Sequence, residues 1–178
     1  MRRRQPLPRL WLMTDERQGE GLWRALERLP RGAGIIFRHY SLPAGERRAL
    51  FERIKAVARQ KRLMLLLAGS AGEARAWGAD GSHGRGSRRS LGLRSAPVHD
   101  LAEIRRAERA GADILFLSPV FATRSHPEAA VLGRVRFGCL ARKTRLPIIA
   151  LGGMNAERAH SLARFGPYGW AAIDAWQE

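Results

Sequence analysis

The sequence predicts an α/β protein built as a compact (β/α)₈ barrel. Eight short apolar runs alternate with helix-length segments along the chain. Nearly continuous apolar strands are typical of a parallel sheet that is covered on both faces, and eight such units are the number that closes a TIM barrel. The length of 178 residues suits one domain, so residues 1–178 are expected to form a single barrel domain. A doubly wound open sheet is the alternative fold.

In the first half of the chain, three of the four apolar runs are followed by a helical pattern. The predicted strands cover residues 10–13, 34–37, 63–67 and 79–83. The predicted helices cover residues 21–29, 44–62 and 71–77. The second helix has an apolar stripe at Leu50, Ile54 and Val57, which is amphipathic spacing. A loop-like stretch, residues 84–90, stands in place of a fourth helix, which is therefore predicted to be shortened or missing.

The second half of the chain repeats the alternation. The predicted strands cover residues 91–95, 114–117, 146–151 and 168–173. The predicted helices cover residues 100–110, 131–143 and 155–164. Asp100 is predicted to cap the first of these helices with Glu103 as its capping-box partner, and Asn155 to cap the third. No helical pattern follows the eighth strand, so the last helix is also predicted to be shortened or missing.

The chain is strongly basic, with a formal net charge of +16. Only Lys55, Lys61 and Lys143 among its 32 basic residues are lysines, and the arginines are spread along the whole chain. A basic surface attracts phosphate-bearing partners, but nucleic-acid modules usually interleave aromatic residues with the basic ones. Here Trp and Phe fall mostly in predicted core positions. Anionic small molecules are therefore the expected partners, and functional nucleic-acid binding is not expected.

Several other classes of protein are excluded by composition. No apolar run approaches the ~20 residues of a membrane span, and no apolar signal region follows the basic N-terminus, so a cytoplasmic protein is expected. The single Cys139 cannot form an internal disulfide and is expected to be a small packed residue. The five histidines lack metal-ligand spacing such as HExxH.

The strand predicted at residues 146–151 runs into Gly152 and Gly153, and then into a helix start at Asn155. This order is typical of a phosphate-binding turn. Glycine lets the backbone approach a ligand closely, and free N–H groups at a helix N-terminus face an anion. A plain strand-to-helix turn is the alternative interpretation.

Four segments of the chain occur in the order and spacing of the thiamine phosphate synthase/TenI family. They are WLMTD (residues 11–15), GADGSH (78–83), GAD with SPVFAT (111–123) and LPIIALGGMN (146–155). The chain resembles this family over nearly its whole length. The resemblance implies a (β/α)₈ barrel and a transferase of thiamine biosynthesis. That enzyme joins hydroxymethylpyrimidine diphosphate to thiazole phosphate, uses Mg²⁺ and releases pyrophosphate. Family members often form dimers, so a homodimer is implied as well.

Site residues follow from the resemblance position by position. Arg38, at the end of the second strand, matches the family's diphosphate-binding arginine, and Ser95, after the fifth strand, matches a serine near the diphosphate. These two residues are the predicted catalytic residues. Thr123 matches a hydroxyl that holds the thiazole phosphate, and Gly152 and Gly153 match the turn that cradles that phosphate. His99, in the motif after Ser95, is a further candidate.

The chain departs from the family where Mg²⁺ would bind. Mg²⁺ is usually held by one or two carboxylates together with substrate phosphates. The family's carboxylate after the third strand is replaced by Ala68-Gly69-Ser70, and residues 84–89 contain no carboxylate after the fourth strand. Mg²⁺ is thus implied by the resemblance, but its ligands are not found and no metal ligand is predicted. Arg85, Arg88 and Arg89 are proposed instead to supply positive charge, with Arg88 as a predicted phosphate-binding residue.

Three further departures bear on function. The family's lysine after the strand-six threonine is replaced by Arg124, and Asp174 stands after the eighth strand, where a carboxylate would repel a phosphate. The tautomerase branch of the family relies on a histidine where this chain has Ser118-Pro119, so that activity is not supported. Two functions are weighed first, ahead of a different reaction on a phosphorylated substrate. One is a divergent thiamine phosphate synthase. The other is a catalytically degenerate homologue that binds a phosphorylated small molecule or a protein partner.

Overall fold

A computed structural model describes residues 6–86, 92–124, 128 and 130–176. Its strands are β1 (Leu10–Met13), β2 (Gly34–Phe37), β3 (Met64–Ala68), β4 (Gly81–His83), β5 (Leu93–Val98), β6 (Ile114–Leu117), β7 (Ile148–Ala150) and β8 (Gly169–Ala172). Its helices are α1 (Gly21–Arg28), α2 (Ala44–Lys61), α3 (Ala71–Trp77), α4 (Leu101–Arg109), α5 (Gly133–Ala141) and α6 (Ala156–Ser161). Two 3₁₀ turns, η1 (Glu16–Gln18) and η2 (Ala163–Phe165), complete the described elements.

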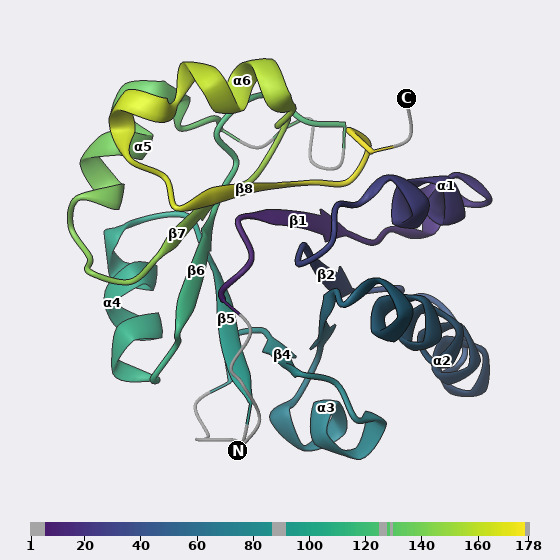
Figure 1. The fold of residues 1–178 in the computed structure, drawn as a ribbon. Helices are drawn as coiled ribbons and strands as arrows, with labels where there is room; N and C mark the ends of the chain where they lie inside the picture. The colour runs from purple at the N-terminus through teal and green to yellow at the C-terminus, as the bar shows by residue number, and fades with distance from the viewer. Residues whose placement is uncertain (1–5, 87–91, 125–127, 129, 177–178) are drawn as a thin grey trace.

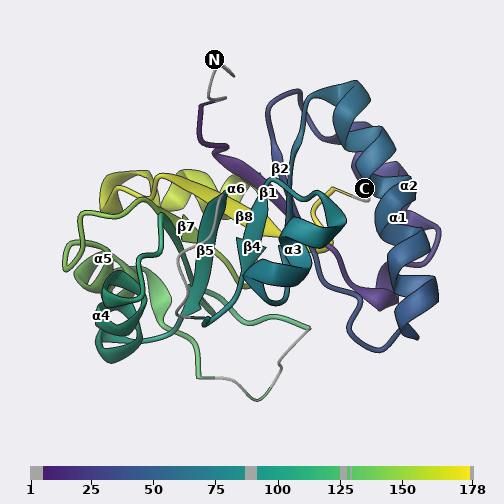
Figure 2. The same cartoon turned by 90° about the horizontal axis from the view of Figure 1, so that it is seen from below.

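The eight strands form a closed parallel barrel in chain order, in which β8 pairs with β1. The closure confirms the predicted barrel and excludes the open sheet. Helices α1 to α3 lie on one side of the barrel and α4 to α6 on the other (Figure 1), as the view from below also shows (Figure 2). No helix is found in the described residues between β4 and β5 or after β8; residues 87–91 and 177–178 lie outside the description.

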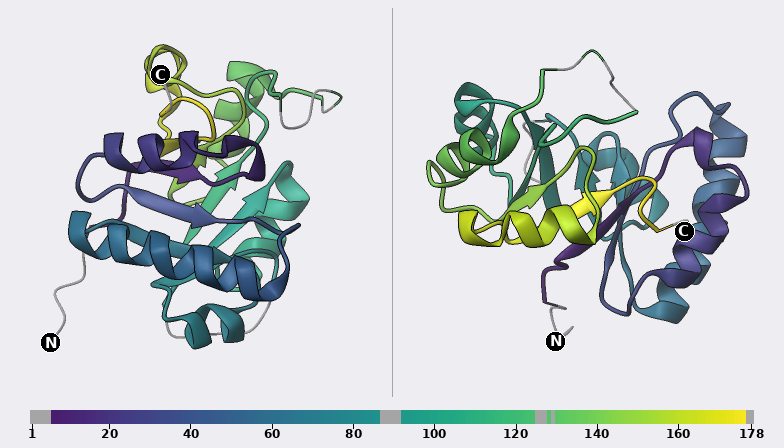
Figure 3. Two further views of the ribbon diagram at one scale, coloured as in Figure 1. Left: turned by 90° about the vertical axis from the view of Figure 1, so that its right-hand side faces the viewer. Right: turned by 90° about the horizontal axis from the view of Figure 1, so that it is seen from above.

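Alternate residues of each strand pack on opposite sides of the barrel wall. Trp11, Ile36 and Phe116 belong to a buried cluster inside the barrel, while Ile35 and Phe37 pack outward against the helices. Because both faces are buried, the strands are apolar at nearly every position. In Figure 3, α1 and α2 lie side by side over this outer surface.

Strand β5 is longer than its predicted range of residues 91–95, because it continues through Pro97 to Val98. Proline lacks the N–H of a strand ladder, which is why the pattern suggested an earlier end. The carbonyl of Ser95 accepts from Gly84 N on the β4 side, whereas that of Val98 accepts from Ser118 N on the β6 side. This alternation turns Pro97 toward the β4 side, where pairing already stops at Ser95, so the missing N–H breaks no ladder bond.

The predicted helix caps Asp100 and Asn155 are confirmed, but the predicted role of Glu103 is not. Asp100 accepts from Glu103 N and Asn155 accepts from Arg158 N, each at 2.8 Å. The Glu103 carboxylate, however, accepts from His99 N at 2.8 Å and not from the N–H of Asp100, so the predicted capping box is wrong. The reason is local geometry: the carboxylate instead bonds both the backbone and the ring of His99.

Cys139 is exposed on α5, so its predicted packing is wrong. The buried face of α5 is formed by Phe137 and Gly138, and a Cβ on Gly138 would lie 2.4 Å from Phe165 Cδ1. That close contact with η2 sets the rotation of the helix and turns Cys139 outward. Among the helices of the described residues, none is both long and apolar enough to cross a bilayer.

Candidate functional site

A cavity of about 580 Å³ opens at the carboxyl ends of the strands. Because all eight strands are parallel, the loops after them meet at this one face, where TIM barrels place their active sites. Among the described residues, the lining comes from the ends of β1, β2 and β4 to β8, and none from the end of β3. The predicted site residues Arg38, Thr123, Gly152 and Gly153 all line the cavity, and so does His99.

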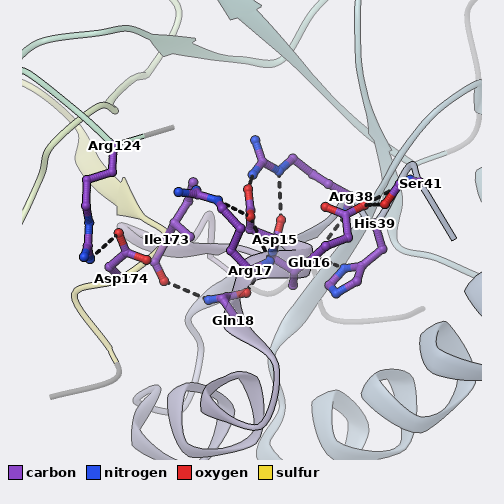
Figure 4. A network of polar contacts seen from close by, with 11 residues as sticks. Asp15, Glu16, Arg17, Gln18, Arg38, His39, Ser41, Arg124, Ile173 and Asp174 are labelled. Atoms are coloured by element: carbon purple, nitrogen blue, oxygen red, sulfur yellow. Dashed lines mark hydrogen bonds and ion pairs between the residues drawn. The ribbon is translucent and has the colours of Figure 1, made fainter. Parts of the chain in front are cut away.

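Arg38 is held in place by the end of β1. Its Nη2 lies 2.5 Å from Asp15 Oδ2, and its Nε donates to the carbonyl of Thr14 at 2.8 Å. Burial alone would raise the pKa of Asp15, but hydrogen bonds from Arg17 and the charges of Arg38 and Arg17 hold that pKa below its ordinary value. Asp15 therefore stays ionised and keeps the guanidinium oriented at the cavity wall (Figure 4).

Arg47, on α2, is only 9% exposed and binds the backbone at the ends of β2 and β3. Its Nε donates to the carbonyl of Arg38 at 3.0 Å, its Nη2 to the carbonyl of Ala68 at 2.8 Å, and its Nη1 to Glu73 Oε1 at 2.9 Å. The other Glu73 oxygen lies 2.6 Å from where a Cβ on Gly69 would stand. At the end of β3, the Glu73 carboxylate thus binds Arg47 and also fills the space that a side chain on residue 69 would need.

A second charged cluster follows β4 and β5. Glu103 Oε1 lies 3.0 Å from Arg85 Nη2, and Glu103 Oε2 lies 2.7 Å from His99 Nδ1. Both Arg85 and His99 line the cavity, whereas Glu103 does not. Together with Arg38, these two residues form what we call the basic wall (Arg38, Arg85 and His99).

Ser95 is placed differently from the prediction. It lies inside β5 and not after it, because the strand continues to Val98. The serine is 2% exposed and does not line the 580 Å³ cavity. Its Oγ lies 2.8 Å from His83 Nδ1, and His83 does line the cavity. The catalytic role of Ser95 stays a prediction.

His83 was counted among the sequence's histidines but was not predicted as a site residue. Burial, aided by the charge of Arg38, lowers its pKa to about 3. The ring is therefore neutral at physiological pH and presents an uncharged edge to the cavity. Its position as the last residue of β4 is the signal that could have identified it, because strand ends in this fold face the site.

Thr123, Gly152 and Gly153 line the cavity from the loops after β6 and β7, and we call these three residues the glycine wall. Gly152 has φ +95° and a Cβ there would lie 2.7 Å from Pro119 Cα; Gly153 has φ +59° and its Cβ would lie 2.3 Å from the carbonyl of Ala122. The glycines therefore let the loops after β6 and β7 touch. Their predicted phosphate-binding roles stay predictions.

Asp174 also lines the cavity, beside the glycine wall. Its Oδ2 lies 3.0 Å from Arg124 Nη2, so a charge expected to repel phosphate is paired with the arginine that follows Thr123 (Figure 4). This pairing joins the loops after β6 and β8. Arg88 and Arg89 lie outside the described residues.

The closed parallel barrel, with its cavity at the carboxyl ends of the strands, defines a TIM-barrel-like α/β protein. Within that class, the chain belongs to the thiamine monophosphate synthase family, whose model matches residues 10–176. It is 32% identical to a putative thiamine-phosphate synthase 2 of Aquifex aeolicus, over 97% of this chain and 99% of that protein. It is 29% identical to a thiamine-phosphate synthase of Chloroflexus aurantiacus, over 94% of this chain and 84% of that protein.

A solved structure gives the same assignment. The thiamine phosphate pyrophosphorylase of Pyrococcus furiosus superposes with a TM-score of 0.77 at 25% identity, covering 95% of this chain and 86% of that one. The family resemblance and the barrel predicted from the sequence are thereby confirmed.

The described residues do not fit the Mg²⁺ ion that the family typically uses. No group of three or more His, Cys, Asp or Glu residues that could hold a metal is found in the described part of the chain. Asp174 is the only carboxylate among the described residues that line the cavity, and it is paired with Arg124. Mg²⁺ prefers oxygen ligands, usually carboxylates and phosphates. The described side chains around the cavity therefore supply few of the ligands that Mg²⁺ prefers.

Proposed function

We propose that this chain is a divergent thiamine phosphate synthase. It would join hydroxymethylpyrimidine diphosphate to thiazole phosphate and release pyrophosphate. The observation that supports this reaction best is Arg38, oriented at the cavity wall by Asp15 and Thr14. The cavity volume of about 580 Å³ lies within the range of small-molecule sites.

In this proposal the two walls divide the substrates between them. The diphosphate lies against the basic wall, because guanidinium groups make bidentate contacts with phosphate oxygens. The thiazole phosphate lies against the glycine wall, where Arg124 offsets the charge of Asp174. The thiazole nitrogen then faces the methylene carbon of the pyrimidine across the cavity.

The reaction replaces one bond with another. The C–O bond between the pyrimidine methylene and the diphosphate breaks, and its electron pair leaves with the diphosphate. The thiazole nitrogen lone pair forms the new C–N bond. Negative charge grows on the leaving group, so fixed positive groups such as Arg38 lower the barrier. A neutral His83 adds no positive charge near the electron-poor methylene carbon.

A second function, a degenerate homologue that binds a phosphorylated small molecule or a protein partner, is favoured by a different observation. The family's metal-binding carboxylates are missing from the sequence after β3 and β4, and the nearby Asp15, Glu73 and Glu103 are each paired with an arginine. Such a protein would bind the substrates without joining them.

A product assay tests the synthase proposal. Purified protein is mixed with both substrates, with and without Mg²⁺, and thiamine phosphate is quantified. We expect product, and we expect Arg38→Met to lower kcat/KM by about 100-fold, since charged phosphate contacts are each worth roughly 1.5–3 kcal/mol. Arg109→Met, on the exposed far end of α4, is the matched control and should leave kcat/KM unchanged. A folded wild-type sample that forms no product would reject the synthase and favour the degenerate binder.

A further inference from the structure

We propose that the arginines of the basic wall replace Mg²⁺ as the counter-charge of the diphosphate, so that this site binds diphosphate without a metal ion. The inference rests on the proposed function and names how its first substrate is held. It departs from the family's use of Mg²⁺, and it follows from how the charges around the cavity are paired.

The first step of the argument is that the nearby carboxylates already have cationic partners. Asp15 Oδ2 lies 2.5 Å from Arg38, Glu73 Oε1 lies 2.9 Å from Arg47, and Glu103 Oε1 lies 3.0 Å from Arg85. A carboxylate that coordinated Mg²⁺ through these oxygens would have to give up an arginine. Removing the acidic partner of a largely buried arginine is costly, so metal binding at Asp15 or Glu73 would oppose the observed pairing with Arg38 and Arg47.

The second step is that the same pairs orient the arginines toward the ligand space. Arg38 comes from the end of β2 and Arg85 from the loop after β4, and both line the one cavity. His83, the last residue of β4, lines the same cavity and stands two positions before Arg85. Each arginine is braced by a carboxylate on the protein side, and a guanidinium has five N–H donors in all.

The third step concerns the chemistry of the charge. A diphosphate presents several anionic oxygens, and two guanidinium groups can pair with them through parallel N–H bonds. Arginine remains charged at every physiological pH. His99, held by Glu103 at 2.7 Å, adds an imidazole beside Arg85. The basic wall therefore presents guanidinium N–H donors to the diphosphate oxygens, and these contacts are the ones that we assign in place of a divalent cation.

The test uses inorganic pyrophosphate as the probe, with isothermal titration calorimetry of the full chain in EDTA and, separately, in MgCl₂. We expect binding in EDTA and no tighter binding with Mg²⁺. Arg85→Met should weaken the EDTA affinity about tenfold or more, as loss of a charged hydrogen-bond partner does. Arg109→Met is the matched control and should bind as the wild type does. Pyrophosphate binding that is seen only with Mg²⁺ would overturn the proposal.

A second variant separates a bracing carboxylate from a metal ligand. Glu103→Gln removes one negative charge beside the basic wall, so we expect pyrophosphate to bind in EDTA as tightly as before or more tightly. If Glu103 instead held Mg²⁺, the variant would lose binding in MgCl₂, and the proposal would fail. An unchanged thermal midpoint confirms that the variant is folded.

The two proposals fail in different ways. Thiamine phosphate formation that requires Mg²⁺, together with pyrophosphate binding that requires Mg²⁺, would keep the synthase and overturn metal-free binding. Pyrophosphate binding in EDTA without any product would support the metal-free site and reject the synthase.

Discussion

His83 is kept neutral by its position in the barrel wall. The residue is 5% exposed, and burial, with a smaller effect of Arg38, lowers its pKa to about 3. Its Nδ1 is bonded to Ser95 Oγ at 2.8 Å, and its ring meets Phe116 edge to face at 5.2 Å between centroids. In the unfolded chain the same imidazole takes up a proton near pH 6.5. The protonation of one side chain is therefore linked to folding.

This linkage predicts a loss of stability on mild acidification. Between pH 6.5 and 3 the unfolded chain binds the additional proton, so the free energy of unfolding falls as pH falls, by about 2 kcal/mol between pH 6.5 and 5. His83→Asn, which keeps a hydrogen-bonding group for Ser95, should lose this part of the slope. Burial also lowers the pKa of His39, so His39 also makes the free energy of unfolding fall with pH. It does so in the wild type and in His83→Asn alike.

Urea unfolding at several pH values measures the effect. His160→Asn, at an exposed position of α6, is the matched control and should keep the wild-type slope. Equal slopes for the wild type and His83→Asn would show that His83 is not the group responsible.

The loops after β6 and β7 depend on glycine for their contact. Phe121 N donates to the carbonyl of Gly152 at 3.1 Å, and Val120 N to that of Leu151 at 2.9 Å. A side chain on Gly152 would meet the backbone of Pro119 and Val120, within 2.7 and 3.1 Å. Close packing is therefore enough to explain why residue 152 is a glycine. The glycine wall is built jointly by the loops after β6 and β7.

Gly152→Ala should therefore destabilise the protein by about 2 kcal/mol or more, because the alanine is both strained at positive φ and overpacked. Gly45→Ala is the matched control: Gly45 lies in the first turn of α2, with nothing within 4 Å of its added Cβ. There alanine should stabilise the helix by up to about 1 kcal/mol. Chemical denaturation of both variants decides the matter, and similar changes in both would contradict the packing explanation.

The molecule as a whole carries a net charge of +16, but its basic residues are spread along the whole chain and not concentrated in one segment. Many of them cover aromatic rings or pair with acids: Arg53 lies 4.4 Å from the Trp23 ring centroid, and Arg48 binds Glu52 at 2.5 Å. Dispersed charge attracts polyanions weakly and without sequence preference. The homodimer implied by the resemblance stays a prediction.

We therefore expect duplex DNA to bind only at low ionic strength. With about four phosphate contacts, the affinity should fall roughly 100-fold between about 50 and 200 mM salt. Fluorescence anisotropy with two duplexes of unrelated sequence measures this loss. Tight binding at about 150 mM salt that distinguishes the two duplexes would contradict it and would assign the charge a nucleic-acid function.

Much of the fold could be predicted because helix and strand patterns are local. Each predicted strand overlaps an observed one, and the caps Asp100 and Asn155 are where the sequence suggested. The misjudged end of β5 has a non-local cause, since Pro97 fits the strand only because β4 has already ended beside it. The wrong prediction for Cys139 also has a non-local cause, since the contact of Gly138 with Phe165 sets the rotation of α5.

The candidate site was predictable only in part. Strand-end positions and the family motifs brought Arg38, Thr123 and the two glycines to one cavity. They did not show that Ser95 is buried against His83, because that contact depends on the register of β4 with β5.

Local patterns and motifs along the chain were enough to predict the barrel, its family and a few of the residues around its mouth, among them Arg38, Thr123, Gly152 and Gly153. The pairing of charges at that mouth was decided by the folded chain. Asp15 and Arg38 are 23 positions apart, and Arg124 and Asp174 are 50 positions apart. Such groups become partners only because a closed parallel barrel brings the ends of β1 and β2, and of β6 and β8, to the same face.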